Sequence, residues 1–166
     1  MNDVLDRPTL GQIQKKEADP VVAMIHDLAV DRTLFEEKIE RIEGRLLELG
    51  WTELPVNHHF ADGVYFREGT IPKGSLILGH AHKREDLTVF FSGRLLLAVD
   101  GVVKEVHGPC VVKTPPGARK IGYVLEETRG GNIHANPSNE RDISKVEADM
   151  VYFSKTYLAF KAKELT

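Results

Sequence analysis

The eight residues GHAHKRED (79–86) carry the side chains best suited to chemistry. His80 and His82 are two positions apart, and Asp86 follows four residues later. In an extended strand, residues two apart point to the same side, so both imidazoles are predicted to share one face. Two imidazoles and a carboxylate can provide three ligands to Fe(II), Mn(II), Ni(II) or Zn(II). Such a set leaves coordination positions free, which a metal oxygenase requires.

The residues from Trp51 onward are predicted to form the β-rich domain that positions these side chains. Short apolar or alternating runs are separated there by glycine and proline, which is typical of strands joined by turns. Asp100 and Gly101 lie between two such runs and give the strongest local hairpin signal. The predicted strands are residues 63–72, 87–93, 94–106, 109–117 and 120–126. Many short strands with regular turns indicate an antiparallel sandwich or barrel.

The spacing of residues in this region resembles a known family. Gly74, His80, His82, Asp86 and Gly93 are placed as in the first sequence motif of the cupins, with aspartate where that motif has glutamate. Gly108, Pro115 and Gly117 are similar to the second cupin motif, with one gap longer by a residue. The resemblance covers about residues 58–126. It implies a mainly β protein with a cupin-type double-stranded β-helix, or jelly roll.

The resemblance also implies a further histidine ligand at position 120, where this chain has Lys120. A protonated lysine cannot ligate a cation and would repel it. His134, in the later segment GGNIHANP, could complete the metal site, and Glu85 could replace Asp86.

A metal-free barrel is the other interpretation of the same residues. The histidines would then be hydrogen-bonded strand residues inside the barrel or at its mouth. Four basic side chains near them in the sequence could form a polar, anion-accepting pocket. These are Arg67, Arg94, Arg119 and Lys120.

Three longer segments resemble a narrower group, the small cupin-like proteins encoded largely in tailed-phage genomes. The segments are YFREGTIPKGSLILGHAHK, GPCVVKTPPGARKIGY and IHANPSNERDISKVEAD. That group has no settled activity. The resemblance implies a phage setting and supplies no mechanism.

Residues 21–49 carry an apolar stripe with alternating steps of four and three, broken at Arg32. The pattern predicts helices over 21–30 and 33–49, with Thr33 and Glu36 as a capping box and Gly50 at the C-terminal end. The stripe either covers the chain's own barrel or joins chains into a dimer or trimer. In the second case, Lys38 and Glu43 would flank the seam and pair between chains.

The end of the chain is also predicted to be helical. Ile143, Val146, Met150, Phe153, Tyr157 and Phe160 follow steps of three and four. Ser144 and Glu147 have capping-box spacing, and MVYF (150–153) could instead form a short strand. Two amphipathic flanks on one barrel favour contacts between subunits.

Length and composition limit the partners and the domain count. The chain has 166 residues, a formal charge of −3 and 42% hydrophobic residues, which predicts a soluble protein with one core. Nucleic acid is an unfavourable partner for this charge, and no apolar run predicts a membrane span or a secretion signal. The expected segments are an N-terminal arm (1–20), a helical segment (21–50), the jelly roll (51–135) and a C-terminal helical segment (136–166).

Two functions remain open at this level. One is a non-catalytic, oligomeric cupin-like protein of phage type, made in the host cytoplasm. It would be a virion-associated or accessory component that contacts other phage structural proteins. The other is a small metal-dependent cupin enzyme, an oxygenase or isomerase, that uses His80, His82 and Asp86, with His134 as a further ligand. We favour the first because the ligand set is incomplete and the helical flanks are long.

Overall fold

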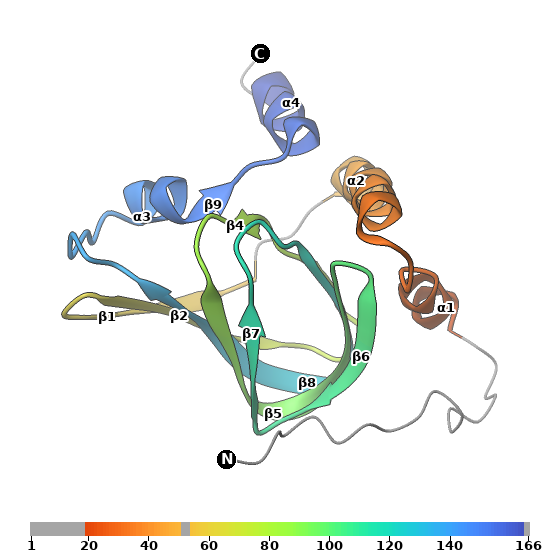
Figure 1. Cartoon of the computed structure of the whole chain (residues 1–166), viewed down its shortest axis with the longest axis horizontal. Helices are drawn as coiled ribbons and strands as arrows, with labels where there is room; N and C mark the ends of the chain where they lie inside the picture. The colour runs from red at the N-terminus through yellow and green to blue at the C-terminus, as the bar shows by residue number, and fades with distance from the viewer. Residues whose placement is uncertain (1–18, 51–53, 165–166) are drawn as a thin grey trace.

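Two long antiparallel strands form the frame of the molecule (Figure 1). They are β5 (Asp86–Val99) and β8 (Lys120–Ala135), and they pair with each other along most of their length. The computed structural model describes residues 19–50 and 54–164.

The two long strands lie in one seven-stranded sheet that curves around a common interior, and each has different neighbours along its two halves. The first half of β5 pairs with β7 (Cys110–Thr114), and its second half pairs with β6 (Val102–His107). The first half of β8 pairs with β3 (Leu76–Leu78), and its second half pairs with β2 (Val64–Ile71), which continues to β1 (Val56–Ala61). This antiparallel barrel, flanked by helices at both ends of the chain, confirms the predicted mainly β jelly roll.

Glycine is required at the corner where β5 bends between the half that pairs with β7 and the half that pairs with β6. The register between β5 and β8 shifts between Phe90 and Leu95. Gly93 lies at this bend with a φ of 94°, and a Cβ there would lie 2.3 Å from the carbonyl oxygen of Glu127. A side chain at this position would therefore clash with the neighbouring strand.

The hairpin predicted at Asp100 and Gly101 is confirmed. Val99 pairs with Val102, and the two residues between them have φ angles of 47° and 81°. Two consecutive positive φ angles are the mark of the tight turn that matches the twist of paired strands.

Two helices precede the barrel, and the predicted break between them is present. They are α1 (Pro20–His26) and α2 (Arg32–Leu49). The predicted capping box at Thr33 is wrong, because Asp31 is the N-cap of α2 and its side chain accepts a hydrogen bond from the amide of Leu34. Gly50 ends α2 with a φ of 97°.

The apolar stripe of these helices packs on the chain's own barrel. Phe35 and Ile39 of α2 are fully buried in a cluster with Leu96 and Ile121 of the barrel. Ile25 of α1 belongs to the same cluster. The interpretation in which the stripe covers the chain's own barrel therefore holds for these residues, whereas Leu49 at the end of the stripe is 75% exposed.

The C-terminal segment consists of two helices with a short strand between them, so the MVYF segment is partly a strand as one alternative predicted. The elements are α3 (Ile143–Met150), β9 (Val151–Tyr152) and α4 (Lys155–Glu164). The helix start predicted from Ser144 is wrong, since Asp142 caps α3 by accepting from the amides of Ser144 and Lys145. β9 pairs with β4 (Ala81–His82), so this segment lies directly against the strand that carries His82 (Figure 1).

Two parts of the predicted segmentation fall outside the described residues: most of the N-terminal arm and the boundary at Trp51. Within the described ranges, none of the helices has the length and apolar character to cross a bilayer.

Candidate functional site

Three of the four predicted metal ligands come together inside the barrel. His82 lies on β4, Asp86 begins β5 and His134 lies near the end of β8. One ligand atom from each lies within 4.8 Å of the other two. His134 thus joins the His82 and Asp86 pair, as one interpretation of the sequence expected.

Strand register explains why residues so far apart in sequence meet. Leu87 pairs with Ile133 and Thr88 with Asn132. Successive side chains alternate between the two faces of a strand, so Asp86 and Thr88 face the interior together with Asn132 and His134. The long β5–β8 ladder therefore brings the sequence motif to the later histidine.

His80 is placed elsewhere. Its ring centroid lies 5.0 Å from that of Phe153 and 4.8 Å from that of Tyr157, both in the segment formed by β9 and α4. The prediction that His80 and His82 share a face assumed a continuous strand, but β4 contains only Ala81 and His82. The alternation therefore does not extend to His80, which packs against the C-terminal segment.

Lys120 occupies the centre of the site and makes an ion pair with Asp86. Its Nζ lies 2.9 Å from Oδ2 of Asp86 and also donates to the hydroxyls of Thr88 and Thr114, at 2.9 and 3.1 Å. Nδ2 of Asn132 donates to the same carboxylate oxygen at 2.6 Å. This oxygen of Asp86 is therefore saturated by protein donors.

Sequence reasoning missed Thr88, Thr114 and Asn132 as members of this site. Thr88 could have been found, because it lies two residues after Asp86 on the same strand and must share its face. Thr114 and Asn132 reach the site through strand pairing with Asp86 and Thr88, for which the sequence gives no local signal.

The second oxygen of Asp86 faces His82. Its Oδ1 lies 2.9 Å from Nδ1 of His82, yet neither atom has a hydrogen bond of acceptable geometry among the described residues. Buried polar atoms are normally hydrogen-bonded. Two such atoms beside a second histidine fit a divalent cation as a common partner, and they are the feature that favours a metal here.

The charge of Lys120 works against such a cation. A metal held by His82, Asp86 and His134 would bind a carboxylate whose charge Lys120 already balances. Glu85 does not replace Asp86, because its half-exposed side chain pairs with Lys113 at 2.8 Å. The geometry of the three donors thus fits a divalent metal, but the positive charge of Lys120 lowers the affinity expected for such an ion.

Asp86, His134 and Lys120 have shifted pKa values. Burial by itself would raise the pKa of Asp86, but His82 and Lys120 outweigh it and hold that pKa well below its ordinary value. Burial, aided by the neighbouring His82, lowers the pKa of His134 to about 4. Burial also lowers the pKa of Lys120, against the opposing effect of Asp86. His134 is therefore neutral at pH 7 and can act as a ligand or hydrogen-bond acceptor.

The low pKa of His134 predicts a loss of stability in mild acid. Between the unfolded pKa of 6.5 and the folded value of about 4, the unfolded chain binds a proton that the folded chain does not. Stability therefore falls as the pH falls through this window, by about 2–3 kcal/mol between pH 7 and pH 4.5. Urea unfolding of chelator-treated protein at several pH values measures the slope. His134→Gln should reduce the slope and leave the part due to His80, whose pKa burial also lowers. His107→Gln alters an exposed strand histidine and should leave the slope unchanged; equal slopes in all three proteins would contradict the assignment.

Each of the other three cations considered for an anion pocket has its own acidic partner. Arg67 pairs with Glu147 of α3 at 3.5 Å. Arg94 pairs with Glu105 and Glu126, at 2.9 and 3.0 Å. An anion at any of these positions would have to displace a carboxylate.

Arg119 forms the most buried of these pairs, with Glu43 of α2. The side chains are 8% and 2% exposed, and the nearest nitrogen and oxygen are 3.0 Å apart. The hydroxyl of Ser154 donates to the same carboxylate at 2.6 Å. One of the two interpretations of the helical stripe paired Glu43 with Lys38 of another chain. In the structure Glu43 joins α2, the barrel and the residue before α4 within one chain.

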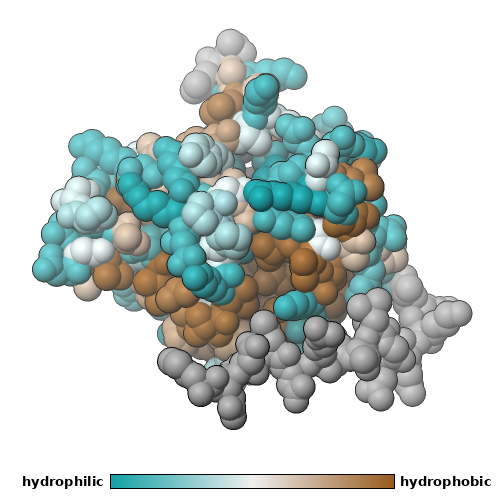
Figure 2. All heavy atoms as spheres, in the orientation of Figure 1, coloured by the Kyte–Doolittle hydropathy of each residue, from teal (hydrophilic) through white to brown (hydrophobic). Residues whose placement is uncertain are grey.

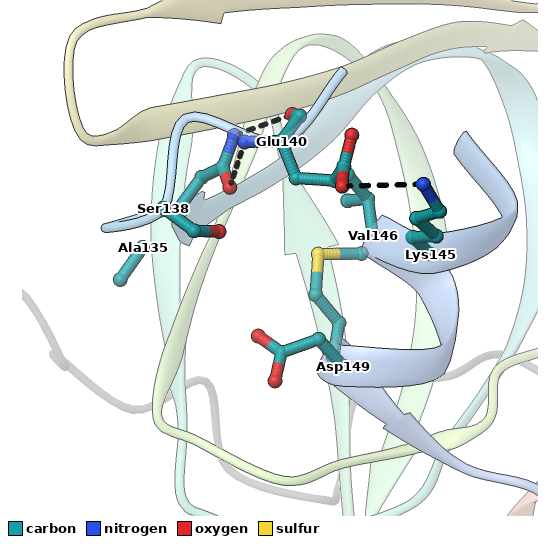
Figure 3. A pocket seen from close by; sticks show the side chains of 8 residues that line it. Ala135, Ser138, Glu140, Lys145, Val146 and Asp149 are labelled. Carbon is teal, nitrogen blue, oxygen red and sulfur yellow. Dashed lines mark hydrogen bonds and ion pairs between the residues drawn. The ribbon is translucent and has the colours of Figure 1, made fainter. Parts of the chain in front are cut away.

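A cavity of about 240 Å³ lies between α3 and the loop that follows β8 (Figure 3). Its lining includes Ala135, next to His134, and Met150, next to the β9 residue that pairs with His82. Glu140 and Lys145 face each other across it, 3.9 Å apart (Figure 3). The cavity is thus a polar hollow whose lining includes the chain neighbours of His134 on β8 and of Val151 on β9.

No protein-family model and no curated protein matches the sequence. Among solved structures, the chain is similar to KdgF from Halomonas sp., with 13% identity, a TM-score of 0.46 and coverage of 58% of this chain and 92% of that one. It is also similar to the Schizosaccharomyces pombe Cnp3 cupin domain, with 15% identity, a TM-score of 0.45 and coverage of 57% of this chain and 73% of that one. A third similar structure is a cupin 2 conserved barrel domain protein from Salinispora arenicola, with 17% identity, a TM-score of 0.44 and coverage of 57% of this chain and 85% of that one. A likeness at this level transfers no activity or residue role to this chain.

Proposed function

We propose that this protein is a non-catalytic barrel protein that acts by binding and assembly, as a virion-associated or accessory component in a phage setting. The observation that carries the proposal is that Asp86 binds other side chains of the barrel interior. Lys120 and Asn132 both bind its Oδ2, so the central carboxylate of the site holds the barrel interior together.

The burial of the site supports the same proposal. The side chain of Asp86 is fully buried and that of His82 is 12% exposed. β9 pairs over the strand that carries His82, so the C-terminal segment covers this end of the barrel. A metal-dependent enzyme needs free coordination positions that a substrate can reach, and this arrangement offers a substrate little access.

The phage setting rests on the three sequence segments that resemble small cupin-like phage proteins. An assembly role predicts that the encoding gene lies in a cluster of tail or capsid genes. Location inside an operon of metabolic enzymes would contradict this part of the proposal.

A second candidate is a metal-dependent enzyme, and the unpaired Nδ1 of His82 and Oδ1 of Asp86 specifically favour it. His82, Asp86 and His134 would hold the ion. When bound, a divalent metal would supply Lewis-acid chemistry at its open positions. Asn132 and Lys120 would then fix the orientation of Asp86 through its other oxygen.

Elemental analysis of untagged protein distinguishes the two candidates. After incubation with Fe, Mn, Ni or Zn salts and desalting, the non-catalytic proposal predicts well under one metal ion per chain, because Lys120 balances the only carboxylate ligand. Stoichiometric metal that is lost in His82→Gln and His134→Gln, and retained in the control His107→Gln, would instead support the enzyme. His107 is a suitable control because its side chain on β6 is 64% exposed and pairs with Glu105.

A further inference from the structure

The outer face of one sheet is apolar across four strands. Six side chains form this face, which we call the outer apolar face: Phe66 on β2, Ile133 on β8, Leu87, Val89 and Phe91 on β5, and Val111 on β7. Leu87, Phe91 and Val111 are 42%, 44% and 60% exposed. Strand pairing joins the members, since Ile133 lies opposite both Phe66 and Leu87, and Val89 lies opposite Val111. Hydrophobic side chains gather in the lower half of the view, where Figure 1 places β5 and β7 (Figure 2).

The beginning of β5 departs from the usual pattern, although Phe90 further along the strand is buried in an apolar cluster. An antiparallel sheet with one solvated face normally places apolar residues inward and polar residues outward. Here Asp86, Thr88 and Asn132 face inward and hydrogen-bond one another or Lys120. On β5, Leu87 lies between Asp86 and Thr88, and Val89 follows Thr88. Both Leu87 and Val89 face outward. Exposed apolar side chains over a polar part of the interior indicate that another molecule covers the outer face when the protein functions.

The rim of the outer apolar face carries charges of both signs that pair with each other. Arg129 lies over the ring of Phe91 at 5.3 Å and binds Glu68 at 2.7 Å. Lys113 pairs with Glu85 at 2.8 Å. This rim has no excess of one sign, so it neither repels an identical surface nor attracts an anionic one such as an acidic membrane or nucleic acid.

We propose that the outer apolar face binds the same face of a second copy of this chain, related by a two-fold axis. In such an interface each patch meets itself, and rim acids of one copy can lie opposite rim bases of the other. Much of the helical stripe is buried on the barrel, whereas Leu87, Phe91 and Val111 of this face are exposed and open to a second copy. This inference rests on the proposed assembly function, and it names the surface through which two chains would associate.

A matched pair of substitutions tests this interface. Val111→Glu places a charge in the outer apolar face, and Val102→Glu places the same charge on β6, where the valine is similarly exposed at 54%. Light scattering and sedimentation over a wide concentration range should show a wild-type dimer. Val111→Glu should raise the dimer dissociation constant at least about tenfold, and Val102→Glu should leave it unchanged.

Each contrary result has a distinct meaning. A wild-type monomer at all concentrations, or a dimer that Val111→Glu leaves intact, would overturn the interface. Binding of wild-type monomer to neutral lipid vesicles that Val111→Glu abolishes would assign the face to a membrane and also overturn it. Metal-dependent catalysis by an intact dimer would overturn the proposed function and leave the interface standing. Melting curves of both variants check that each is folded.

Discussion

Replacing Lys120 by methionine is expected to lower the free energy of unfolding by about 3–5 kcal/mol at pH 7. The lysine side chain is 11% exposed and the Asp86 side chain is fully buried. The pKa of Asp86 lies well below its ordinary value, because His82 and Lys120 outweigh burial. The substitution removes one of the two groups that oppose the effect of burial, and it leaves the buried carboxyl group with Asn132 and Thr88 as neutral donors. Urea unfolding of wild type and variant measures the difference.

Two controls separate this effect from the loss of any lysine. Lys113→Met removes a strand lysine whose pair with Glu85 is solvated, with side chains 65% and 53% exposed, and should cost less than about 1 kcal/mol. The double variant Lys120→Met, Asp86→Asn should recover much of the loss, because the buried charge is removed with its partner. If Lys120→Met costs no more than Lys113→Met, Asp86 is not held as a buried anion.

The fold was largely predictable because its signals are local. Alternating apolar runs, the Asp100–Gly101 turn and the glycine at the β5 corner each act over a few residues. The break before α2 was also visible, although the capping residue is Asp31 instead of Thr33. Neighbouring polar residues can serve equally well as caps, so the spacing alone could not choose between them.

The candidate site was only partly predictable because its geometry depends on pairing between distant strands. His82 and Asp86 follow from their short spacing, and His134 joins them through the register of β5 and β8. His80 was misplaced because β4 ends after two residues. The role of Lys120 changed as well: the sequence presented it as a missing ligand, and its contacts make it the counter-ion of Asp86.

Glu43 illustrates a different limit of pattern reading. A charged residue beside a helical stripe is usually solvated, and its position suggested pairing between chains. In the structure Glu43 is 2% exposed and binds Arg119 and Ser154. A buried acid in a helix can be recognised only when its basic partner from another element is known.

Replacing Arg119 by methionine is expected to cost about 3–5 kcal/mol of folding free energy and to loosen both helical flanks. Among the residues that the structure describes, the variant leaves buried Glu43 with Ser154 as its single side-chain donor. The hydroxyl of Ser154 also accepts from the amide of Tyr157 in the first turn of α4, so the change reaches the C-terminal helix. Hydrogen exchange should show faster exchange in α2 and α4, and unchanged protection in β5 and β8, under conditions where the variant remains folded.

Arg94→Met is the matched control for this substitution. Arg94 also binds two acidic partners, but its side chain is 35% exposed and that of Glu126 is 60% exposed, so its loss should cost less than about 1 kcal/mol. Adding Glu43→Gln to Arg119→Met should restore part of the stability, since an amide can stay buried at lower cost than a charge. Equal costs for Arg119→Met and Arg94→Met, with α4 exchanging as in the wild type, would contradict the view that one buried ion pair fastens both flanks to the barrel.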